Sequence, residues 1–318
     1  MLKSKRNIQS EGKSLRGSLC PRLSNALFRV TASTLLVIFS FTPPQVSVRI
    51  AEAQSQVKVR PLIIAHRGGA QESTENTIAA FRRAGKIGAD GIETDIRLTR
   101  DGVVAVYHDD YFGRVEGLPQ AERKRLVSDL TYSELSKQTL VPVGEDKGGR
   151  RVPTFDDLLA NVKSGLLNIE IKPCGRCDEM ISRTVAALKR FPELDRVVLE
   201  AHGMDTAEKL RAALGPRLKL QINPDFDESI PYDIALKQVL KFKPHSISVS
   251  YKKFSKEIVE LAHEAGVEVW VWTVNSADIA EAMRLLGADA IKTDRPSTLL
   301  ALFKSSRQTY ENGTSNRR

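Results

Sequence analysis

A regular alternation of short apolar runs with longer amphipathic segments constrains the fold of this chain from residue 61 onward. Short β-branched runs predict strands, and apolar residues at helical spacing predict helices. The expected strands are 62–65, 91–98, 166–171, 196–200, 218–222, 246–250, 267–272 and 288–291. The expected helices are 77–86, one opening at 153–159, 178–190, 206–214, 232–242, 255–265 and 277–286.

Eight strands joined by helices predict an α/β protein, an eight-stranded (β/α)8 TIM barrel. An open, doubly wound sheet is the weaker alternative, because no Gly-x-Gly-x-x-Gly sequence opens a helix. Residues 99–102 are too short for a crossover helix, so the run ending at His108 is expected to fold back as an antiparallel hairpin strand. This would bring His108 to the rim of the site. Residues 111–151 are polar and rich in glycine, and we interpret them as an insertion over the active face.

The formal charge of +9 is concentrated at the N-terminus. Residues 1–53 hold eight Lys or Arg and two Glu, which is +6, so +3 remains for the rest of the chain. This remainder gives no reason to expect a nucleic-acid partner. The 41% of hydrophobic residues and 27% of charged residues are typical of a globular domain.

The basic N-terminus precedes an uncharged stretch, 30–41, and then the small-residue sequence Ala51-Glu52-Ala53. This order is typical of a secretory signal peptide over residues 1–53, cleaved after Ala53. The alternative is an uncleaved N-terminal membrane anchor, although the prolines at 43 and 44 make a poor span. We therefore expect an exported protein with one domain over 54–303 and a polar, disordered tail over 304–318. No stable membrane span is expected in the mature chain, and the sequence leaves the oligomeric state open.

Three cysteines are present. Cys20 would leave with the signal peptide, whereas Cys174 and Cys177 stand three residues apart. In an exported protein this spacing favours a local disulfide that closes the loop. A single close pair supplies too few ligands for structural zinc.

Glu93 and Asp95 stand two residues apart in the second expected strand, so both carboxylates leave the strand on one face. Glu170 and Lys172 repeat this spacing in the third strand. The simpler interpretations are that one of Glu93 and Asp95 is a solvated carboxylate and that Glu170 and Lys172 form a plain ion pair. Three carboxylates converging at one end of a barrel instead favour a hard divalent cation, Mg²⁺ or Ca²⁺.

His66 and His108 each follow an apolar run, and sites are built at such strand ends. A single histidine is more often a packed residue than a catalyst, but two of them beside a carboxylate pair can give and take a proton. Arg67, next to His66, and Lys172 would supply positive charge to a bound phosphate.

The run from residue 66 to 114 resembles the glycerophosphodiester phosphodiesterase family. The family signature reads His-Arg-Gly, Pro-Glu-Asn-Thr, Gly-Ala-Asp-x-x-Glu-x-Asp, Thr-x-Asp-Gly and His-Asp. The corresponding residues are His66-Arg67-Gly68, Glu75-Asn76-Thr77, Gly88 to Asp95, Thr99 to Gly102 and His108-Asp109, with Thr74 in place of the usual proline. Beyond this run, Trp272-Thr273-Val274-Asn275 is similar to the family's Trp-Thr-x-Asn, and Thr293 to Pro296 to its closing Thr-Asp-x-Pro, which we interpret as structural.

The resemblance implies that Glu170 joins Glu93 and Asp95 as a metal ligand, with one Ca²⁺ or Mg²⁺ bound. The sequence does not choose between these ions, and export slightly favours Ca²⁺. Glu75 and Asn76 would support the site, and Trp272 would line the pocket. The alternative of core packing fits Trp270 equally well.

Glu200 and His202 stand at the end of the fourth strand, where the family often has small or aromatic residues. Both are expected to face the pocket. They would add to the metal site or to headgroup recognition, or else form a hydrogen-bonded pair with each other.

The implied reaction is hydrolysis of a small-molecule glycerophosphodiester to glycerol 3-phosphate and an alcohol, with His66 and His108 as acid and base. By the resemblance, the adjacent glycerol hydroxyl attacks first, and water then opens a cyclic phosphate. The alternatives are a lysophospholipase D or sphingomyelinase D-like enzyme on the same barrel, favoured by an apolar surface around the insertion, and a non-catalytic headgroup-binding protein.

Overall fold

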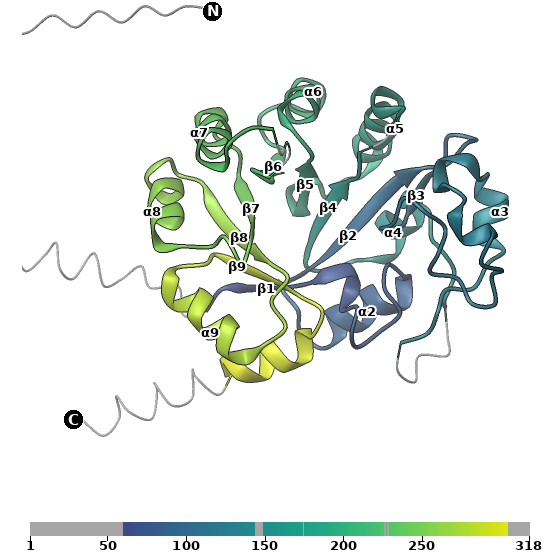
Figure 1. The fold of residues 1–318 in the computed structure, drawn as a ribbon, viewed down its shortest axis with the longest axis horizontal. Coiled ribbons are helices and arrows are strands. Elements are labelled where there is room, and N and C mark those ends of the chain that lie inside the picture. The colour runs from purple at the N-terminus through teal and green to yellow at the C-terminus, as the bar shows by residue number, and fades with distance from the viewer. Residues whose placement is uncertain (1–59, 144–148, 174, 226, 228, 305–318) are drawn as a thin grey trace, which may run out of the picture. The chain divides into compact units, whose positions relative to one another are not determined.

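The computed structural model describes residues 60–143, 149–173, 175–225, 227 and 229–304. In this part of the chain, strands gather at the centre and helices surround them (Figure 1). The parallel strands are β1 (Leu62–Ala65), β2 (Gly91–Leu98), β4 (Leu166–Ile171), β5 (Val197–Ala201), β6 (Lys219–Ile222), β7 (Ser246–Ser250), β8 (Glu268–Trp272) and β9 (Ala290–Thr293).

The strands pair in the order β1-β9-β8-β7-β6-β5-β4-β2, and β1 also pairs with β2. In one of these registers Asp95 of β2 lies opposite Glu170 of β4. The sheet therefore closes on itself, which confirms the predicted (β/α)8 barrel. The expected hairpin is confirmed as well, because β3 (Val104–Val106) pairs antiparallel with β2.

The helices follow the predicted periodicity closely. They are α2 (Ile78–Lys86), α3 (Tyr132–Ser136), α4 (Phe155–Asn161), α5 (Cys177–Arg190), α6 (Met204–Leu214), α7 (Tyr232–Phe242), α8 (Lys256–Glu264) and α9 (Ala277–Leu286), with a further helical run at 296–304. The Thr77 side chain caps α2 by accepting a hydrogen bond from the Ala80 backbone N–H. A reciprocal capping box between Thr154 and Asp157 begins α4.

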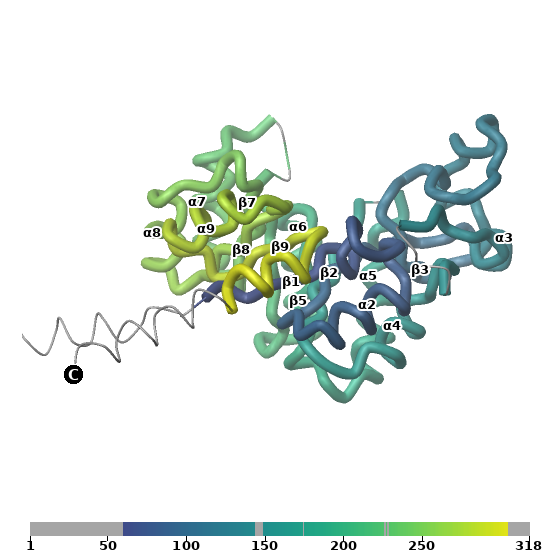
Figure 2. The backbone as a smooth tube through the Cα atoms, turned by 90° about the horizontal axis from the view of Figure 1, so that it is seen from below, coloured from purple at the N-terminus to yellow at the C-terminus, as the bar shows by residue number. Residues whose placement is uncertain are grey.

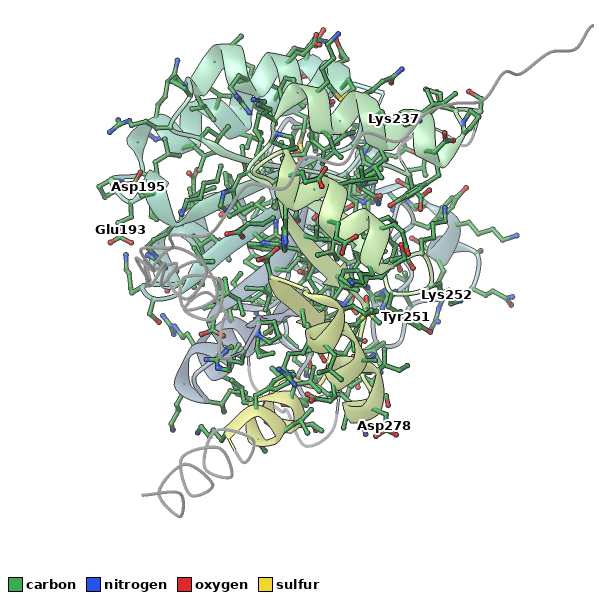
Figure 3. All side chains as sticks on the ribbon, turned by 90° about the vertical axis from the view of Figure 1, so that its left-hand side faces the viewer. Glu193, Asp195, Lys237, Tyr251, Lys252 and Asp278 are labelled. Atoms are coloured by element: carbon green, nitrogen blue, oxygen red, sulfur yellow. The ribbon has the colours of Figure 1, made fainter. Side chains whose placement is uncertain are left out.

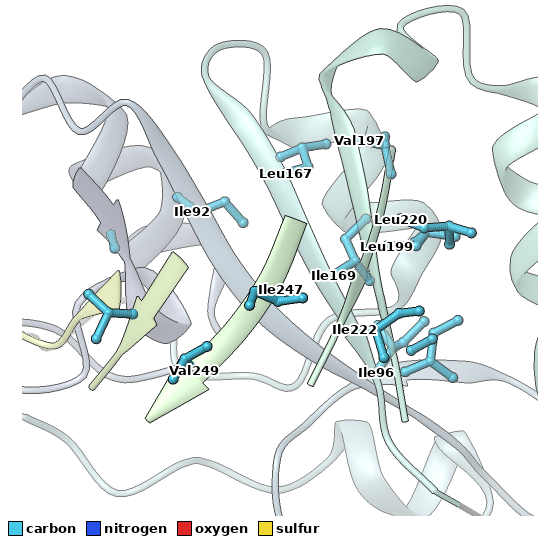
Figure 4. Packing of buried hydrophobic residues seen from close by; sticks show 14 of the residues in the cluster. Ile92, Ile96, Leu167, Ile169, Val197, Leu199, Leu220, Ile222, Ile247 and Val249 are labelled. Atoms are coloured by element: carbon cyan, nitrogen blue, oxygen red, sulfur yellow. The ribbon is translucent and has the colours of Figure 1, made fainter. Parts of the chain in front are cut away.

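Alternation along the strands divides the barrel into two faces. Outward residues such as Ile92, Leu167 and Leu199 join the large apolar cluster between the sheet and the helices (Figure 4). Some inward residues form a small apolar cluster in the barrel interior, which includes Ile64, Trp270 and Ala290. Toward the carboxyl ends of the strands, the inward positions become polar and build the site.

The described part of the insertion, residues 111–143 and 149–151, packs beside β3 around a small apolar core. Phe112, Val127 and Leu135 are buried in that core together with Tyr107. In Figure 2 the insertion with α3 lies next to β3, while β1 and β9 run side by side although they are far apart in sequence. The insertion therefore adjoins the site from the β2–β3 side.

Charged side chains such as Lys237 on α7 and Asp278 on α9 project away from the barrel (Figure 3). Within the described residues, no helix is long and apolar enough to cross a membrane. The expected signal peptide over 1–53 lies outside the described residues, as does the tail except for Lys304. The expected disulfide cannot be placed either, because Cys174 lies outside them, while Cys177 begins α5.

Candidate active site

A polar pocket of about 210 Å³ lies inside the barrel, where the carboxyl ends of the strands meet. It collects residues from all eight parallel strands or the turns that follow them, and from the end of the β2–β3 hairpin. The lining residues are His66, Arg67, Glu93, His108, Glu170, Lys172, Glu200, His202, Asn223, Ser248, Trp272, Thr273 and Lys292.

Three acidic side chains converge at this pocket, and two of them, Glu93 and Glu170, line it. Glu93, Asp95 and Glu170 each offer a carboxylate oxygen, and these oxygens all lie within 4.8 Å of one another. Glu93 and Asp95 are buried inward residues of β2, and Glu170 faces them from the neighbouring strand β4. The predicted convergence of the three carboxylates is confirmed.

Lys172 holds two members of this acidic cluster in their charged forms. Its Nζ atom lies 2.6 Å from Glu170 Oε1 and 3.0 Å from Asp95 Oδ1. Burial opposes ionisation of both carboxyls, but Lys172, together with His202 at Glu170 and His108 at Asp95, outweighs it and lowers both pKa values. The expected Glu170–Lys172 ion pair thus exists within the cluster rather than as an alternative to it.

Glu93 is the member with excess negative charge around it. Burial, reinforced by the nearby Asp95, raises the pKa of Glu93 to about 7. The Arg67 backbone N–H donates to Glu93 Oε2 at 2.9 Å. A cation among these carboxylates would offset the repulsion between Glu93 and Asp95.

The turn after β1 places this backbone donor. Arg67 has a φ of 52°, in the left-handed region that non-glycine residues seldom adopt. Gly68 follows with a φ of 82°, and a Cβ atom there would lie 2.8 Å from the Ala80 Cβ. The His-Arg-Gly sequence therefore needs its glycine for close packing of the turn against α2.

His66 is held from behind by a carboxylate. Its Nδ1 lies 2.6 Å from Asp294 Oδ1, and Asn275 Nδ2 donates to the other Asp294 oxygen at 2.7 Å. Burial opposes protonation of His66, but Glu93 and Asp294 outweigh it and raise its pKa. The Nε2 atom remains directed at the pocket, 3.8 Å from Glu93 Oε2.

His108 has a similar arrangement at the end of β3. Its Nδ1 lies 2.6 Å from Asp109 Oδ1, and Arg114 Nε donates to Asp109 Oδ2 at 2.6 Å. Burial opposes ionisation of Asp109, but His108 and Arg114 hold its pKa well below the ordinary value. Both histidines therefore direct Nδ1 to a carboxylate.

Glu75 and Asn76 both contact residues of the site. Glu75 bridges two guanidinium groups, with Arg114 Nη1 at 2.8 Å and Arg67 Nη1 at 3.3 Å from its Oε2. Asn76 Nδ2 donates to Asp95 Oδ2 at 3.0 Å.

Glu200 and His202 both line the pocket, but the pair expected between them is absent from the described contacts. His202 Nε2 hydrogen-bonds Glu170 Oε1, whereas Glu200 pairs with Lys292 Nζ from β9. The two residues lie at different depths of the barrel, so each meets a different strand. The pairing prediction is therefore wrong.

Trp272 lines the pocket, and its indole N–H is buried without a hydrogen-bond partner among the described residues. Trp270, two residues earlier on the same inward face, is fully buried in the interior cluster. Trp272 therefore lines the pocket and Trp270 packs in the core, which are the two alternatives that the sequence left open.

Asp294 and Lys292 are among the residues at the pocket that the sequence analysis did not assign to the site. Asp294, interpreted as structural, holds His66; its place directly after a strand was the available signal. Lys292 is buried at the pocket floor, and its position within an otherwise apolar strand was the signal there.

A closed barrel with clustered carboxylates and two carboxylate-held histidines defines a hydrolase-type site. The sequence model of the glycerophosphoryl diester phosphodiesterase family matches residues 66–298. A glycerophosphodiester phosphodiesterase of Caldanaerobacter subterraneus subsp. tengcongensis is 32% identical over 250 residues, which are 77% of this chain and 99% of that protein. The chain belongs to the glycerophosphoryl diester phosphodiesterase family and is an enzyme of that class.

Solved structures share the fold. One from Silicibacter pomeroyi, described as a putative glycerophosphoryl diester phosphodiesterase, has 23% identity and a TM-score of 0.68 over 77% of this chain and 94% of its own. A phosphodiesterase of Oleispira antarctica, in complex with the product sn-glycerol-3-phosphate, has 24% identity and a TM-score of 0.67 over 77% of this chain and 97% of its own.

Proposed function

We propose that this enzyme hydrolyses glycerophosphodiesters to glycerol 3-phosphate and an alcohol, using one divalent cation and two histidines. The observation that carries the proposal is the geometry of His66 and His108 around the acidic cluster. Each ring has a carboxylate at Nδ1, and both line the pocket that holds Glu93 and Glu170. The product complex of the Oleispira antarctica phosphodiesterase supports the choice of product.

The residues present fit a hard cation. The cluster offers carboxylate oxygens, which suit Ca²⁺ and Mg²⁺, and a cation would offset the repulsion between Glu93 and Asp95. Glu93, Asp95 and Glu170 would hold the ion. When bound, it would supply positive charge to the non-bridging oxygens of the phosphate.

The side chains of the protein would divide the remaining tasks. Arg67 and Lys172 add fixed positive charge beside the bound phosphate, which gains negative charge in the transition state. In the first step, one histidine takes the proton from the attacking glycerol hydroxyl at Nε2, and the other protonates the leaving alkoxide, which gives an alcohol and a cyclic phosphate. Water then opens the cyclic phosphate to glycerol 3-phosphate. Asp294 and Asp109 keep Nδ1 of each ring protonated, so that Nε2 is the atom that exchanges protons.

The test is an assay of glycerophosphodiesters with different headgroups, each with Ca²⁺, with Mg²⁺ and with chelator. We expect release of glycerol 3-phosphate that disappears with chelator and returns on adding one of the two ions. Turnover that is indifferent to the chelator would refute the cation's role. Loss of turnover in His66→Asn and in His108→Asn, with cation binding retained, is expected from the assignment of the two rings.

A lysophospholipid substrate is the second candidate, because a larger and more apolar cavity of about 330 Å³ adjoins the site. It lies between the turn before α2 and the insertion, where Leu140, Val141 and Val143 line it. Val141 is 48% exposed and Tyr111 55%, so the insertion presents apolar surface. A single acyl chain would fit such a cavity. Comparing lysophosphatidylcholine with glycerophosphocholine, before and after Val141→Asp, separates the two candidates.

We also propose that the protein is exported by an N-terminal signal peptide, with cleavage after Ala53. The basic segment, apolar stretch and Ala51-Glu52-Ala53 sequence support this proposal. N-terminal sequencing of the protein from its cell envelope or medium should begin at Gln54, and an intact N-terminus in the membrane fraction would favour the anchor instead.

A further inference from the structure

A buried ion pair crosses the pocket floor and has no task in the reaction described above. Lys292 of β9 and Glu200 of β5 are each 3% exposed, and Lys292 Nζ donates to Glu200 Oε2. These strands are separated by β6, β7 and β8 in the sheet order, so the pair spans the barrel interior.

The ammonium group of Lys292 is fully satisfied. Besides Glu200, its Nζ donates to Gln221 Oε1 at 2.8 Å and to Ser248 Oγ at 3.2 Å, which uses all three of its N–H groups. Gln221 is in turn held by Ser246 at 2.9 Å. The positive charge is therefore fixed in position.

Both members of the pair line the same pocket as Glu93 and Glu170. Lys292 brings a positive charge to this pocket, while Glu200 brings a further carboxylate. In a water-poor interior, charges act on one another over longer distances than at the surface. Each member thus changes the electrostatic potential at the cluster, and the two do so in opposite directions.

We propose that the Glu200–Lys292 pair sets the affinity of the acidic cluster for its divalent cation, without touching that cation. Glu200 and Lys292 are positioning residues that act through the electrostatic potential at the cluster. The inference rests on the proposed cation site, and it concerns two residues that are not members of the acidic cluster. Opposite charges in the pair predict opposite effects of their removal.

The experiment measures binding of Ca²⁺ and of Mg²⁺ by calorimetry to the purified mature protein. Glu200→Gln keeps the side-chain shape and an oxygen that can accept from Lys292, but it leaves the lysine charge uncompensated. We expect the dissociation constant of the cation to rise about tenfold. Glu281→Gln is the matched control, because it removes the same charge from a surface pair with Arg284 and should leave the affinity unchanged.

Lys292→Met removes the opposing charge, so its dissociation constant should be equal to that of the wild type or lower. The double variant Glu200→Gln with Lys292→Met removes the pair, and its affinity should return to within about twofold of the wild type. A purely structural pair would instead lower affinity in both single variants, in parallel with their melting temperatures.

Unchanged affinity in Glu200→Gln, or a double variant as weak as that single variant, would overturn the inference. If Lys292→Met does not fold, Glu200→Gln and the double variant still decide. A wild-type protein that binds neither cation would refute the proposed cation site instead, so the two failures are distinguishable.

Discussion

The Nδ1 atom of His66 lies 2.6 Å from Oδ1 of Asp294, a contact across 228 residues of chain. It joins the first and last strands of the barrel at the pocket. This contact fixes which ring nitrogen faces the substrate, and catalysis should depend on it.

Asp294→Asn should therefore lower kcat by about 100-fold, because an amide can donate to Nδ1 and so favours the wrong tautomer of His66. Cation binding should remain within about twofold, since Asp294, unlike Glu200, does not line the pocket and its carboxylate is turned to His66. Steady-state kinetics and calorimetry check the two expectations. The matched control is Asp289→Asn, which alters another aspartate–histidine contact, with His263, outside the pocket. A similar fall in kcat for both variants would contradict the role given to Asp294.

Cation binding should stabilise the fold through the acidic cluster. At a concentration 100 times the dissociation constant, the ion should add about 2.7 kcal/mol to the free energy of unfolding. Thermal unfolding of the wild type should thus shift upward with Ca²⁺ or Mg²⁺ and fall back with chelator. Asp95→Asn should lose most of this shift, whereas Glu179→Gln, in an ion pair at the surface, should keep it. A full shift in Asp95→Asn would show that the ion binds elsewhere.

His202→Phe tests the contact with Glu170. The histidine Nε2 hydrogen-bonds Oε1 of that carboxylate and helps to orient it, although Lys172 also holds the same oxygen. We expect a moderate loss, a rise of about threefold to tenfold in the cation dissociation constant. An affinity equal to that of the wild type would show that Lys172 orients Glu170 alone.

Asp109 should make stability depend on pH at the acidic end. Its pKa is lowered in the folded protein from an ordinary value of 3.8, because His108 and Arg114 outweigh the effect of burial. A lowered pKa stabilises the fold above the unfolded value, and this stabilisation is lost as the pH falls toward the folded value. Asp109→Asn should therefore cost about 1 kcal/mol at pH 6.5, a figure reduced for partial exposure, and much less near pH 3.

Guanidinium unfolding in the presence of chelator measures this difference at each pH. Asp278→Asn is the control, because that carboxylate projects from α9 and is exposed (Figure 3). A gap between wild type and Asp109→Asn that widens toward low pH would contradict the assignment.

The barrel could be predicted from sequence because alternation and spacing are local properties. The i, i+2 spacing of Glu93 and Asp95 placed both on one face, and the parallel pairing of β2 with β4 brought Glu170 to them. Partners from distant strands could not be predicted in this way. Glu200 meets Lys292 across 92 residues, and local spacing suggested His202 instead. Long-range pairs depend on the strand order and on the depth of each residue in the barrel.

The bridge made by Glu75 between Arg67 and Arg114 has a consequence for redesign. Arg114 belongs to the insertion, whereas Arg67 lies in the turn that also presents His66. If the insertion were exchanged for one with a different headgroup preference, the new sequence would need an arginine in the place of Arg114 to pair with Glu75. Otherwise the exchanged insertion would leave Glu75 with Arg67 as its one remaining partner of the two. The contact between the insertion and the turn after β1 would then be weaker.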